Sequence, residues 1–305
     1  MKKVFLNNIN EDWVVDRFKK EWYDYNSEIS TNVIKESDVI WIIAPWVWKK
    51  ISRRHLNQKK VVCTIHHIDF EKFDKKAEKD FYDRDRYVDE YHVISKKTKI
   101  QVEKLTNKNI NIIPFWVNQK LWFEIKEKDN LYKKFNLNKN NFYIGSFQRD
   151  TEGKDLISPK LSKGPDIFIK VVKEYKKKYE NLEVILSGKR RNYVISKLKE
   201  NNIKFHYFEM VNFEILNELY NCLNLYIVSS RVEGGPQSIM ECAASLTPII
   251  STNVGIAEDI LNKNSIFSLD NFTNGIPDIE FARKNVEKYF IPNGFIQFKK
   301  LFSEI

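Results

Sequence analysis

The sequence lacks the features that mark several common classes of protein. It has three cysteines in 305 residues, at positions 63, 222 and 242, and each falls within an apolar stretch. An odd number of widely separated cysteines argues against a disulfide framework, so we expect reduced core residues in a cytoplasmic protein. No stretch reaches the roughly 18 apolar residues that a membrane-spanning helix needs.

The start of the chain and the missing motifs argue against further classes. The opening segment MKKVFLNNINEDW has two lysines but only a short apolar run, which predicts a first strand and not a signal peptide. The sequence contains no phosphate-binding P-loop and no nucleophile elbow. Its His, Cys and Asp spacings match no zinc site, so we expect no bound metal.

What is present is the composition of a folded protein. Hydrophobic residues make up 42% and aromatic residues 14% of the chain, without a low-complexity run. A chain of 305 residues suits two domains of ordinary size.

The net charge of +10 is unevenly distributed. Residues 1–140 contain 29 Lys/Arg and 21 Asp/Glu, a net of +8, whereas residues 141–305 contain 22 and 20, a net of +2. We therefore expect the first half to meet an anionic partner, such as a phosphorylated acceptor, an anionic lipid or nucleic acid. The alternative is that lysine is simply abundant in this chain.

Short apolar runs alternate with amphipathic helical stretches, which predicts parallel sheets covered by helices on both faces. In the first half the runs are Lys3–Leu6, Val39–Ala44, Val61–Ile65, Tyr91–Ile94 and Ile110–Phe115. In the second half they are Phe142–Phe147, Leu182–Leu186, Phe205–Phe208, Leu223–Val228, Pro248–Ser251 and Ile266–Leu269. The helical patterns include Pro165–Tyr179, Tyr193–Glu200, Phe213–Leu223, Gln237–Ala244, Ile279–Tyr289 and Gly294–Phe302.

Two such series predict an α/β protein with two Rossmann-like, doubly wound domains. We expect an N-terminal domain over residues 1–130 and a C-terminal domain over residues 131–280. Residues 281–305 are expected to form a helical segment that packs back on the N-terminal domain. Ligands should bind at the carboxyl ends of the strands, in a cleft across which the two domains face each other.

The densest functional signal is the segment Tyr226–Ile260, YIVSSRVEGGPQSIMECAASLTPIISTNVGIAEDI. An apolar strand ends at two serines, a Glu-Gly-Gly-Pro loop follows, and a helix starts near Gln237. The paired glycines permit positive φ and close approach of a ligand to the backbone. The N–H groups at such a helix start bind anions such as a diphosphate. Glu233 and Glu241 are placed to accept hydrogen bonds from vicinal hydroxyls, or they are ordinary helix and cap glutamates.

This segment resembles the retaining glycosyltransferases of family four, which have the GT-B fold. The likeness is strong from Phe142 onward and weak before it. It implies that Glu233 contacts the hydroxyls of a donor sugar and that Glu241 contacts the ribose of a nucleotide sugar. It also implies donor contacts from the start of the helix, at Gly234, Gly235, Pro236, Gln237 and Ser238. One departure is Leu246, where the family usually has glycine.

The segment IGSFQRDTEGKDLISPKLSKGPD, residues 144–166, carries a second element. Arg149 follows an apolar strand, and Lys163 begins a Lys-Gly step that opens a helix. A guanidinium and an ammonium that converge on one diphosphate would offset its charge without a metal. The pattern resembles the arginine and Lys-Gly pair of the same family, which implies that Arg149 and Lys163 bind the diphosphate. Lys154 and Lys160 stay alternatives for the lysine.

The segment VVCTIHHIDF, residues 61–70, is a third element, in which a buried strand ends in two histidines. The resemblance implies that Thr64 and His66 lie at the interdomain cleft, where His66 would bind the donor sugar or organise the acceptor. A histidine packed in the core is the alternative, and His67 is the second candidate.

Two further segments are informative because they depart from a site pattern. Asp83-Arg84-Asp85 matches the Asp-x-Asp motif of metal-dependent glycosyltransferases, but it lies in a charged helical stretch, and we interpret it as a solvated helix face. The loop Asn7–Glu11 lacks the glycines that many relatives use, so no acceptor contact is assigned there.

The resemblance implies a hexosyl-type glycosyltransferase that acts with retention of anomeric configuration and without a metal or other cofactor. Its co-substrate would be a nucleotide-diphosphate sugar, and its acceptor a glycan, a lipid-linked sugar or another hydroxyl compound bound by the N-terminal domain. Two alternatives stay open: a GT-B enzyme that glycosylates nucleic acid, and a non-catalytic nucleotide-sugar-binding protein. The joint presence of Glu233, Glu241 and Arg149 favours the enzyme.

The segment WVWKKISRR, residues 46–54, is a candidate for contact with an anionic membrane. Tryptophan beside basic residues suits a lipid interface. On a helix that starts near Trp46, four basic residues would share one face: Lys49, Lys50, Arg53 and Arg54. We therefore expect a cytoplasmic protein with peripheral contact to the inner face of the membrane, or a phosphorylated acceptor on the same surface.

Overall fold

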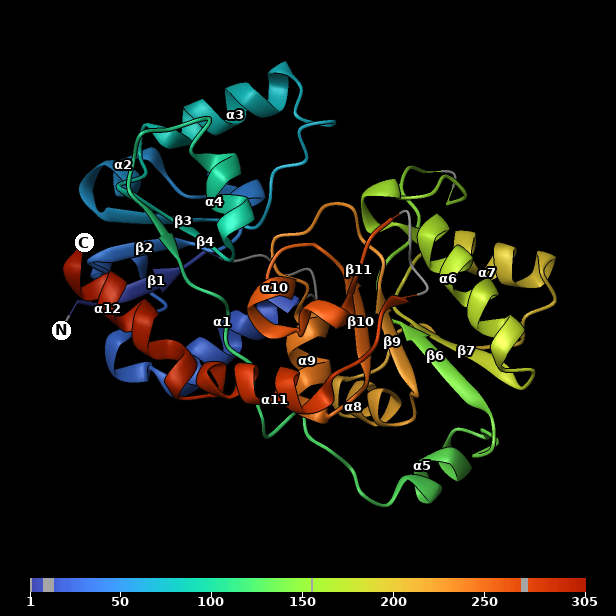
Figure 1. The fold of residues 1–305 in the computed structure, drawn as a ribbon. Helices are drawn as coiled ribbons and strands as arrows, with labels where there is room; N and C mark the ends of the chain where they lie inside the picture. The colour runs from blue at the N-terminus through green and yellow to red at the C-terminus, as the bar shows by residue number, and fades with distance from the viewer. Residues whose placement is uncertain (1, 8–13, 155, 270–273) are drawn as a thin grey trace. The chain divides into compact units, whose positions relative to one another are not determined.

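The structure, a computed structural model, describes residues 2–7, 14–154, 156–269 and 274–305. The chain divides into two compact units (Figure 1). The first unit contains residues 1–115 and 292–305, and the second contains residues 116–291. The sequence analysis instead placed the borders between residues 130 and 131 and between residues 280 and 281. The predicted loop Asn7–Glu11 lies, apart from Asn7, outside the described residues.

The first unit is built on a parallel sheet with the strand order β1-β2-β3-β4-β5. The strands are β1 (Val4–Leu6), β2 (Val39–Ile42), β3 (Lys60–Ile65), β4 (Glu90–Val93) and β5 (Ile110–Ile112). The helices are α1 (Val14–Tyr25), α2 (Arg53–Gln58), α3 (Lys75–Asp85), α4 (Lys96–Val102) and α12 (Ile296–Glu304). Because α12 comes from the end of the chain, this unit is assembled from both ends of the sequence.

The second unit is built on a parallel sheet with the strand order β11-β10-β9-β6-β7-β8. Its strands are β6 (Phe142–Ser146), β7 (Leu182–Ser187), β8 (Phe205–Phe208), β9 (Leu225–Val228), β10 (Ile249–Thr252) and β11 (Ile266–Phe267). Its helices are α5 (Lys128–Lys134), α6 (Pro165–Lys178), α7 (Asn192–Glu200), α8 (Phe213–Asn221), α9 (Gln237–Ser245), α10 (Ala257–Ile260) and α11 (Ile279–Val286). From β6 the chain adds β7 and β8 on one side and then β9, β10 and β11 on the other side. Parallel α/β sheets bind ligands at the point where the strand order changes direction in this way.

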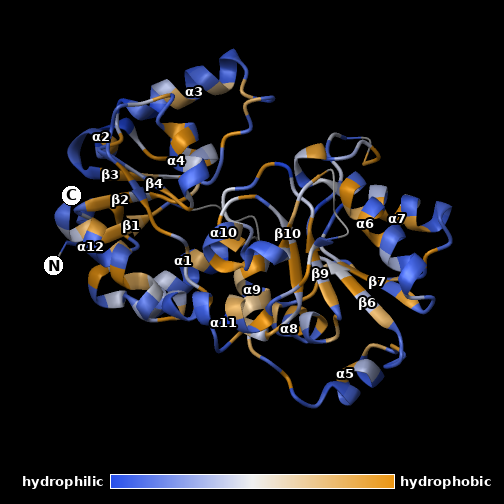
Figure 2. Cartoon of the chain, in the orientation of Figure 1, coloured by the Kyte–Doolittle hydropathy of each residue, from blue (hydrophilic) through white to orange (hydrophobic). Residues whose placement is uncertain are grey.

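The α/β prediction is confirmed, and every described strand overlaps one of the predicted apolar runs. The hydropathy colouring shows why: hydrophobic residues gather on the strands, whereas helices such as α3 and α7 present many polar residues (Figure 2). Continuous apolar strands with helical cover are the expected pattern for a parallel sheet that is buried on both faces.

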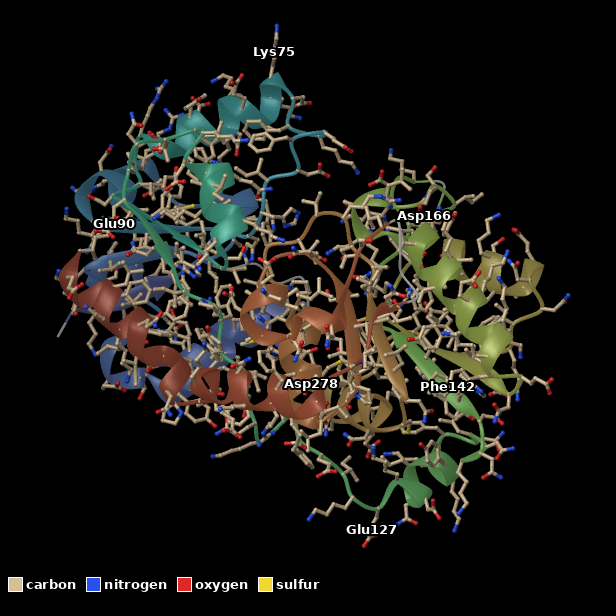
Figure 3. All side chains as sticks on the ribbon, viewed as in Figure 1. Lys75, Glu90, Glu127, Phe142, Asp166 and Asp278 are labelled. Atoms are coloured by element: carbon tan, nitrogen blue, oxygen red, sulfur yellow. The ribbon has the colours of Figure 1, made fainter. Side chains whose placement is uncertain are left out.

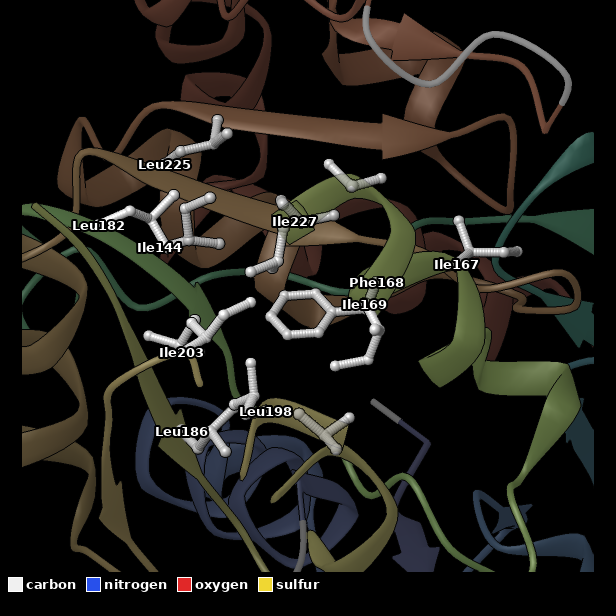
Figure 4. Packing of buried hydrophobic residues seen from close by; sticks show 14 of the residues in the cluster. Ile144, Ile167, Phe168, Ile169, Leu182, Leu186, Leu198, Ile203, Leu225 and Ile227 are labelled. Atoms are coloured by element: carbon white, nitrogen blue, oxygen red, sulfur yellow. The ribbon is translucent and has the colours of Figure 1, made fainter. Parts of the chain in front are cut away.

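The core of the second unit lies between its sheet and helices α6 and α7. Side chains from β6, β7 and β9 meet Phe168 of α6 and Leu198 of α7 in one cluster (Figure 4). Ile144 and Leu198 are fully buried, and Phe168 is 1% exposed. Burial of each such side chain contributes roughly 1.5–3 kcal/mol, so this packing holds rigid the strand ends on which the candidate site is built.

The core of the first unit is rich in aromatic rings that α12 brings to the sheet. The ring of Trp41 on β2 lies 5.1 Å from the rings of Phe298 and Phe302 on α12. Trp22 of α1 lies 5.4 Å from Phe302 in an edge-on arrangement. Such pairs add roughly 0.5–1.5 kcal/mol each beyond the burial of their area, so the C-terminal helix is an integral part of this unit.

A buried chain of hydrogen bonds crosses the same sheet. Trp41 Nε1–H donates to Thr64 Oγ1 at 2.8 Å, and the Thr64 hydroxyl donates to Nδ1 of His92 at 2.9 Å. His92 Nε2–H donates to the carbonyl of Ile113 at 2.7 Å. The Ile113 carbonyl can only accept, so Nε2 carries a proton, and burial disfavours a second proton on Nδ1. Burial lowers the pKa of His92 to about 3.

The single helix predicted from Trp46 is wrong. A 3₁₀ helix over Pro45–Lys50 ends at Ile51, Ser52 caps the separate helix α2, and so the four basic residues do not share one helix face. Trp48 is buried, and its Nε1–H faces the carboxylate of Asp80.

The charge of this segment is also partly compensated. Lys49 forms an ion pair with Asp80 at 2.5 Å, and Lys79 forms one with Asp83 at 2.7 Å. The membrane contact predicted from a continuous Trp and basic face therefore loses its geometric basis. In the described part of the chain, no helix has both the length and the apolarity to cross a membrane.

Candidate functional site

The candidate residues of the second unit lie on loops at the carboxyl ends of neighbouring strands. Arg149 follows β6, the loop after β6 ends at Lys163 where α6 begins, and Glu233 lies between β9 and α9. Since β6 pairs with both β9 and β7, the loops that leave these strands meet at one edge of the sheet.

The structure brings Lys163 and Glu233 together. Lys163 Nζ donates to Glu233 Oε1, although the two residues are 70 positions apart in the chain. The side chains retain exposed fractions of 20% for Lys163 and 10% for Glu233. Ser230 Oγ–H reaches the same carboxylate oxygen at 3.4 Å. A carboxylate and an ammonium that remain partly exposed are able to exchange this contact for a polar ligand.

The backbone at Lys163 is held against the ends of β6 and β9. Gln148 Nε2–H donates to the Lys163 carbonyl at 2.9 Å, and Ser229 Oγ–H donates to it at 3.3 Å. Gly164 has φ +59°, and a Cβ built on it would lie 1.8 Å from the carbonyl oxygen of Ser229. Only glycine fits this approach, so the Lys-Gly step is a steric requirement of the crossing.

A second ion pair joins the same two loops. Asp166, labelled in Figure 3, lies in the first turn of α6, and Arg231 lies between β9 and α9. Arg231 Nη1 and Nη2 donate to the two carboxylate oxygens of Asp166 at 2.8 and 2.7 Å. This bidentate contact lowers the pKa of Asp166 and ties the start of α6 to the loop that carries Glu233.

Gly234 and Gly235 do not adopt the positive φ that glycine permits. Among the described glycines, positive φ occurs at Gly153, Gly164, Gly188 and Gly255. Gly255, which follows β10, has φ +51°, and a Cβ built on it would lie 2.4 Å from the carbonyl oxygen of Gly234. The backbone at Gly255 therefore packs closely against the backbone at Gly234, and this contact requires glycine at position 255.

Glu241 is held by a tyrosine that the sequence analysis missed. The carboxylate lies on α9, is 6% exposed, and accepts a hydrogen bond from the Tyr220 hydroxyl at 2.9 Å. Burial and the charge of Glu241 raise the pKa of Tyr220 well above its ordinary value. The phenol therefore stays protonated and orients the carboxylate.

The first turn of α9 contains an amide without a partner. The side-chain Oε1 and Nε2 of Gln237 are buried and have no hydrogen-bond partner in the described part of the chain. Its neighbour Ser238 hydrogen-bonds with Tyr226, while Pro236 precedes the helix as its cap. A buried amide without a partner costs free energy, so a water molecule or a polar ligand that hydrogen-bonds to Gln237 would stabilise the helix start.

Arg149 is fixed within its own loop. Its Nε–H donates to the carbonyl of Thr151 at 2.7 Å. Burial, followed by the nearby charge of Arg190, lowers the pKa of Arg149. Arg149 and Lys163 thus belong to one loop between β6 and α6, with the guanidinium near Arg190 and the ammonium on Glu233.

A buried ion pair anchors that loop to the next strand. Arg191, which follows β7 and is 1% exposed, donates from Nε to Asp150 Oδ2 at 2.8 Å and from Nη1 to the carbonyl of Ser187 at 2.8 Å. Nη1 also donates to the carbonyl of Ser146, at the end of β6. The position of Arg149 therefore depends on a fully enclosed pair immediately beside it.

His66 lies in the first unit, directly after β3. Its Nε2–H donates to the carbonyl of Ile43 at 2.9 Å, and its ring is stacked on Phe115 at 5.9 Å. Trp46, 51% exposed, lies 5.7 Å from the same ring. Thr64, the other residue of this motif, is enclosed in the hydrogen-bond chain to His92.

The Asp-x-Asp segment is only partly the solvated face that we expected. Asp83 pairs with Lys79, which lowers its pKa. Arg84, however, is 5% exposed, and Asp85 accepts from the Tyr91 hydroxyl at 2.8 Å. Within the described ranges, no three His, Cys, Asp or Glu side chains form a group that could hold a metal ion.

The fold that carries this site defines a class of protein. Two parallel sheets with alternating helices are the GT-B fold, which confirms the predicted architecture. Residues 157–274, which contain Lys163, Glu233 and Glu241, match the family described as Glycosyl transferases group 1. No curated protein sequence matches the chain.

Solved structures with the same fold are distant in sequence. HepE from Anabaena, in complex with UDP and glucose, has a TM-score of 0.77 at 12% identity, over 100% of both chains. Sucrose-phosphate synthase from Thermosynechococcus elongatus has a TM-score of 0.68 at 15% identity, over 98% of this chain and 80% of that one. The pneumococcal O-GlcNAc transferase GtfA, in complex with UDP and GlcNAc, has a TM-score of 0.63 at 13% identity, over 87% and 56%.

Proposed function

We propose that the protein is a retaining, metal-independent glycosyltransferase that transfers a sugar from a nucleotide-diphosphate donor to a hydroxyl acceptor. The observation that carries this proposal is the contact of Lys163 with Glu233, at a backbone crossing that only Gly164 permits. An ammonium for phosphate and a carboxylate for sugar hydroxyls thus lie side by side, close in the chain to the start of α9 and its buried Gln237 amide.

Each side chain then has a role set by its chemistry. Glu233 accepts hydrogen bonds from sugar hydroxyls once the donor takes its place against Lys163. Lys163 and Arg149 offset the charge of the diphosphate, together with the N–H groups at the start of α9. Glu241, oriented by Tyr220, accepts from the ribose hydroxyls. The amide of Gln237 gains a polar partner from the donor.

The proposed reaction proceeds on one face of the sugar. The bond from the anomeric carbon to the diphosphate oxygen breaks, and the acceptor oxygen forms its bond on the same side. The acceptor proton passes to an oxygen of the departing diphosphate, which leaves as the nucleoside diphosphate. Lys163 and Arg149 stabilise the negative charge that develops on this leaving group, the task that a divalent ion performs in other enzymes.

The donor base and the acceptor are proposed by chemical class. Uridine is the first candidate for the base, because HepE and GtfA, which share the fold, were solved with UDP. The acceptor is a glycan or a lipid-linked sugar, and the high positive charge of residues 1–140 favours one that carries an anionic group. His66, partly buried beside the exposed Trp46 on the first unit, would contribute to binding the donor sugar or the acceptor.

The test is isothermal titration of the purified full-length chain with UDP, GDP, ADP and CDP. We expect one of them to bind, and Arg149→Ala to weaken it by about ten- to a hundred-fold, as for the loss of a charge-assisted hydrogen bond. Glu241→Gln should lower the affinities for the nucleoside diphosphate and for the matching nucleoside by similar factors. Glu180→Gln, a charge change on an exposed residue ahead of β7, is the control. Absence of binding by all four nucleotides, or equal binding by the Arg149→Ala variant, contradicts the proposal.

A further inference from the structure

The loop after β7 contains three consecutive basic residues in three different environments. Arg191 is buried against Asp150, and Lys189 is exposed. Arg190 is partly buried between them. The buried arginine is paired with a carboxylate and the exposed lysine is solvated, but the partial burial of Arg190 has no such explanation.

The backbone of Arg190 is held in a conformation that L-residues avoid. Its φ is +60°, in the left-handed region. Its carbonyl accepts hydrogen bonds from the N–H groups of Asp150 at 3.1 Å and Thr151 at 3.3 Å, and from Thr151 Oγ1 at 3.2 Å. The neighbouring Asp150–Arg191 pair locks the same two loops together. The surrounding structure therefore imposes this conformation, and such residues cluster at functional sites.

The side chains of Arg190 and Arg149 converge on one short loop. Arg149 Nε donates to the carbonyl of Thr151, and Arg190 Nη1 donates to the carbonyl of Gly153 at 3.3 Å, so both bind one short loop. Burial lowers the pKa of Arg149, the nearby charge of Arg190 lowers it further, and Glu152 partly offsets this effect. In the part of the chain that the structure describes, no ion pair joins either guanidinium to a carboxylate.

The pair also lies where an anion would arrive. Arg149 follows β6 and Arg190 follows β7, and these two strands are parallel neighbours in the sheet. Their carboxyl ends share the edge at which Lys163 contacts Glu233. Two adjacent like charges that form no ion pair with a described carboxylate are unfavourable alone and favourable around a phosphate, which accepts bidentate hydrogen bonds from guanidinium groups.

We propose that Arg190 is a second phosphate-binding guanidinium, which together with Arg149 grips the diphosphate of the nucleotide donor. The inference rests on the proposed function, since it names the residue that completes the same anion site. The Asp150–Arg191 pair is then its support: it fixes both loops so that the two guanidiniums converge before the ligand binds.

The experiment compares nucleotides with nucleosides in the purified full-length chain. Affinities for UDP, GDP, ADP and CDP and for the four matching nucleosides are measured by titration in the wild type and in Arg190→Ala. We expect Arg190→Ala to lower the affinity for the nucleoside diphosphate that binds by at least ten-fold. The affinity for the matching nucleoside should fall by less than two-fold. Lys189→Ala removes the same charge from the adjacent exposed position and should change neither by more than two-fold.

Two further variants separate binding from folding. Arg190→Gly removes the guanidinium and relieves the left-handed backbone, so its melting temperature should equal or exceed that of the wild type while it binds the diphosphate as weakly as Arg190→Ala. Arg190→Lys should retain part of the affinity.

The proposal is overturned if Arg190→Ala weakens the nucleoside as much as the diphosphate, if it weakens neither, or if Lys189→Ala weakens the diphosphate equally. A wild type that binds none of the four diphosphates overturns the proposed function together with this inference.

Discussion

At the residue scale, the structure shows the backbone conformation of Leu246, which stands where the resembling family usually has glycine. It caps α9 in the left-handed conformation, with φ 55° and ψ 33°. Glycine occupies such a position without strain, whereas an L-residue costs about 1–2 kcal/mol there. The helix-to-strand connection of this chain therefore carries strain at Leu246 that a glycine would relieve.

This explanation is tested by comparing the unfolding free energies of two variants, with glycine or alanine in place of Leu246. Within a helix, glycine is about 1 kcal/mol less stable than alanine, but at Leu246 the order should reverse, because only glycine relieves the positive φ. We expect Leu246→Gly to exceed Leu246→Ala in unfolding free energy by roughly 1 kcal/mol in urea denaturation. Ser196, exposed within α7, is the control at which alanine should be the more stable. The same order at both positions would argue against strain at Leu246.

The sequence predicted site residues whose roles follow from local pattern and missed those that depend on tertiary contact. Lys163 and Glu233 were selected as candidates because glycines, strands and helix starts surround them in the chain. Tyr220 was missed because nothing near it in sequence reveals that its hydroxyl reaches Glu241, 21 positions away. Gly255 could have been found from the sequence, because it is a glycine that follows a strand. The sequence analysis considered only the glycine pair at positions 234 and 235.

At the element scale, the crossing of the β6–α6 and β9–α9 loops is the part of the fold that creates the site. Gly164 opens α6 at the point of closest approach to Ser229, and Arg231 clamps the loops together through Asp166. The position of Lys163 is therefore set by backbone packing, and its contact with Glu233 follows from that packing.

Substitution of Gly164 should disturb both folding and binding. Gly164→Ala combines positive φ with a Cβ that would lie 1.8 Å from a backbone oxygen, so we expect a loss of stability above about 2 kcal/mol and weaker nucleotide binding. Gly188→Ala is the matched control, since it has φ +90° but its Cβ would meet its nearest atom at 3.4 Å. Equal losses of unfolding free energy in the two variants would show that the crossing is looser than described.

The hydrogen-bond chain between β2, β3 and β4 makes the first unit sensitive to acid. The folded state keeps His92 neutral down to a pKa of about 3, whereas an unfolded histidine takes up a proton near pH 6.5. Between these values the unfolded state binds more protons, so stability falls as pH falls. From pH 7 to pH 5 the loss due to this residue should be about 2 kcal/mol.

Urea denaturation at pH 7 and pH 5 isolates the contribution of this histidine. The wild type should lose roughly 2 kcal/mol more than His92→Gln over this interval, because the variant has no buried group to protonate. His55→Gln, on α2, should lose as much as the wild type. A wild type and a His92→Gln variant with equal pH dependence would contradict a buried neutral histidine.

At the scale of the whole molecule, alternation of short apolar runs with amphipathic stretches was sufficient to predict two parallel sheets. It could not predict the break at Ile51 and Ser52, because a serine cap between two basic pairs leaves the three- and four-residue spacing of a helix intact. Nor could it predict the aromatic contacts that join α12 to the first unit, since they link residues from opposite ends of the chain.

Removal of divalent ions tests whether the cationic side chains suffice. We expect EDTA to change the rate of donor turnover by less than two-fold, because Lys163, Arg149 and the start of α9 supply the positive potential that the leaving group needs. The rate with EDTA is compared with that after addition of manganese. Activity that EDTA abolishes and manganese restores would reassign a catalytic role to Asp83 and Asp85.

The central claim, that the crossing of Lys163 and Glu233 is the centre of a glycosyltransferase, is tested most directly by donor turnover. Release of nucleoside diphosphate from UDP-glucose, UDP-N-acetylglucosamine and GDP-mannose is measured by chromatography for the wild type, Glu233→Gln and Glu180→Gln. We expect the wild type and Glu180→Gln to turn over one donor at the same rate. Glu233→Gln should be at least about a hundred-fold slower, as for removal of a group that stabilises the transition state, while its affinity for the bare nucleotide stays within about three-fold. No release by the wild type, or equal rates for Glu233→Gln and the wild type, would contradict the account.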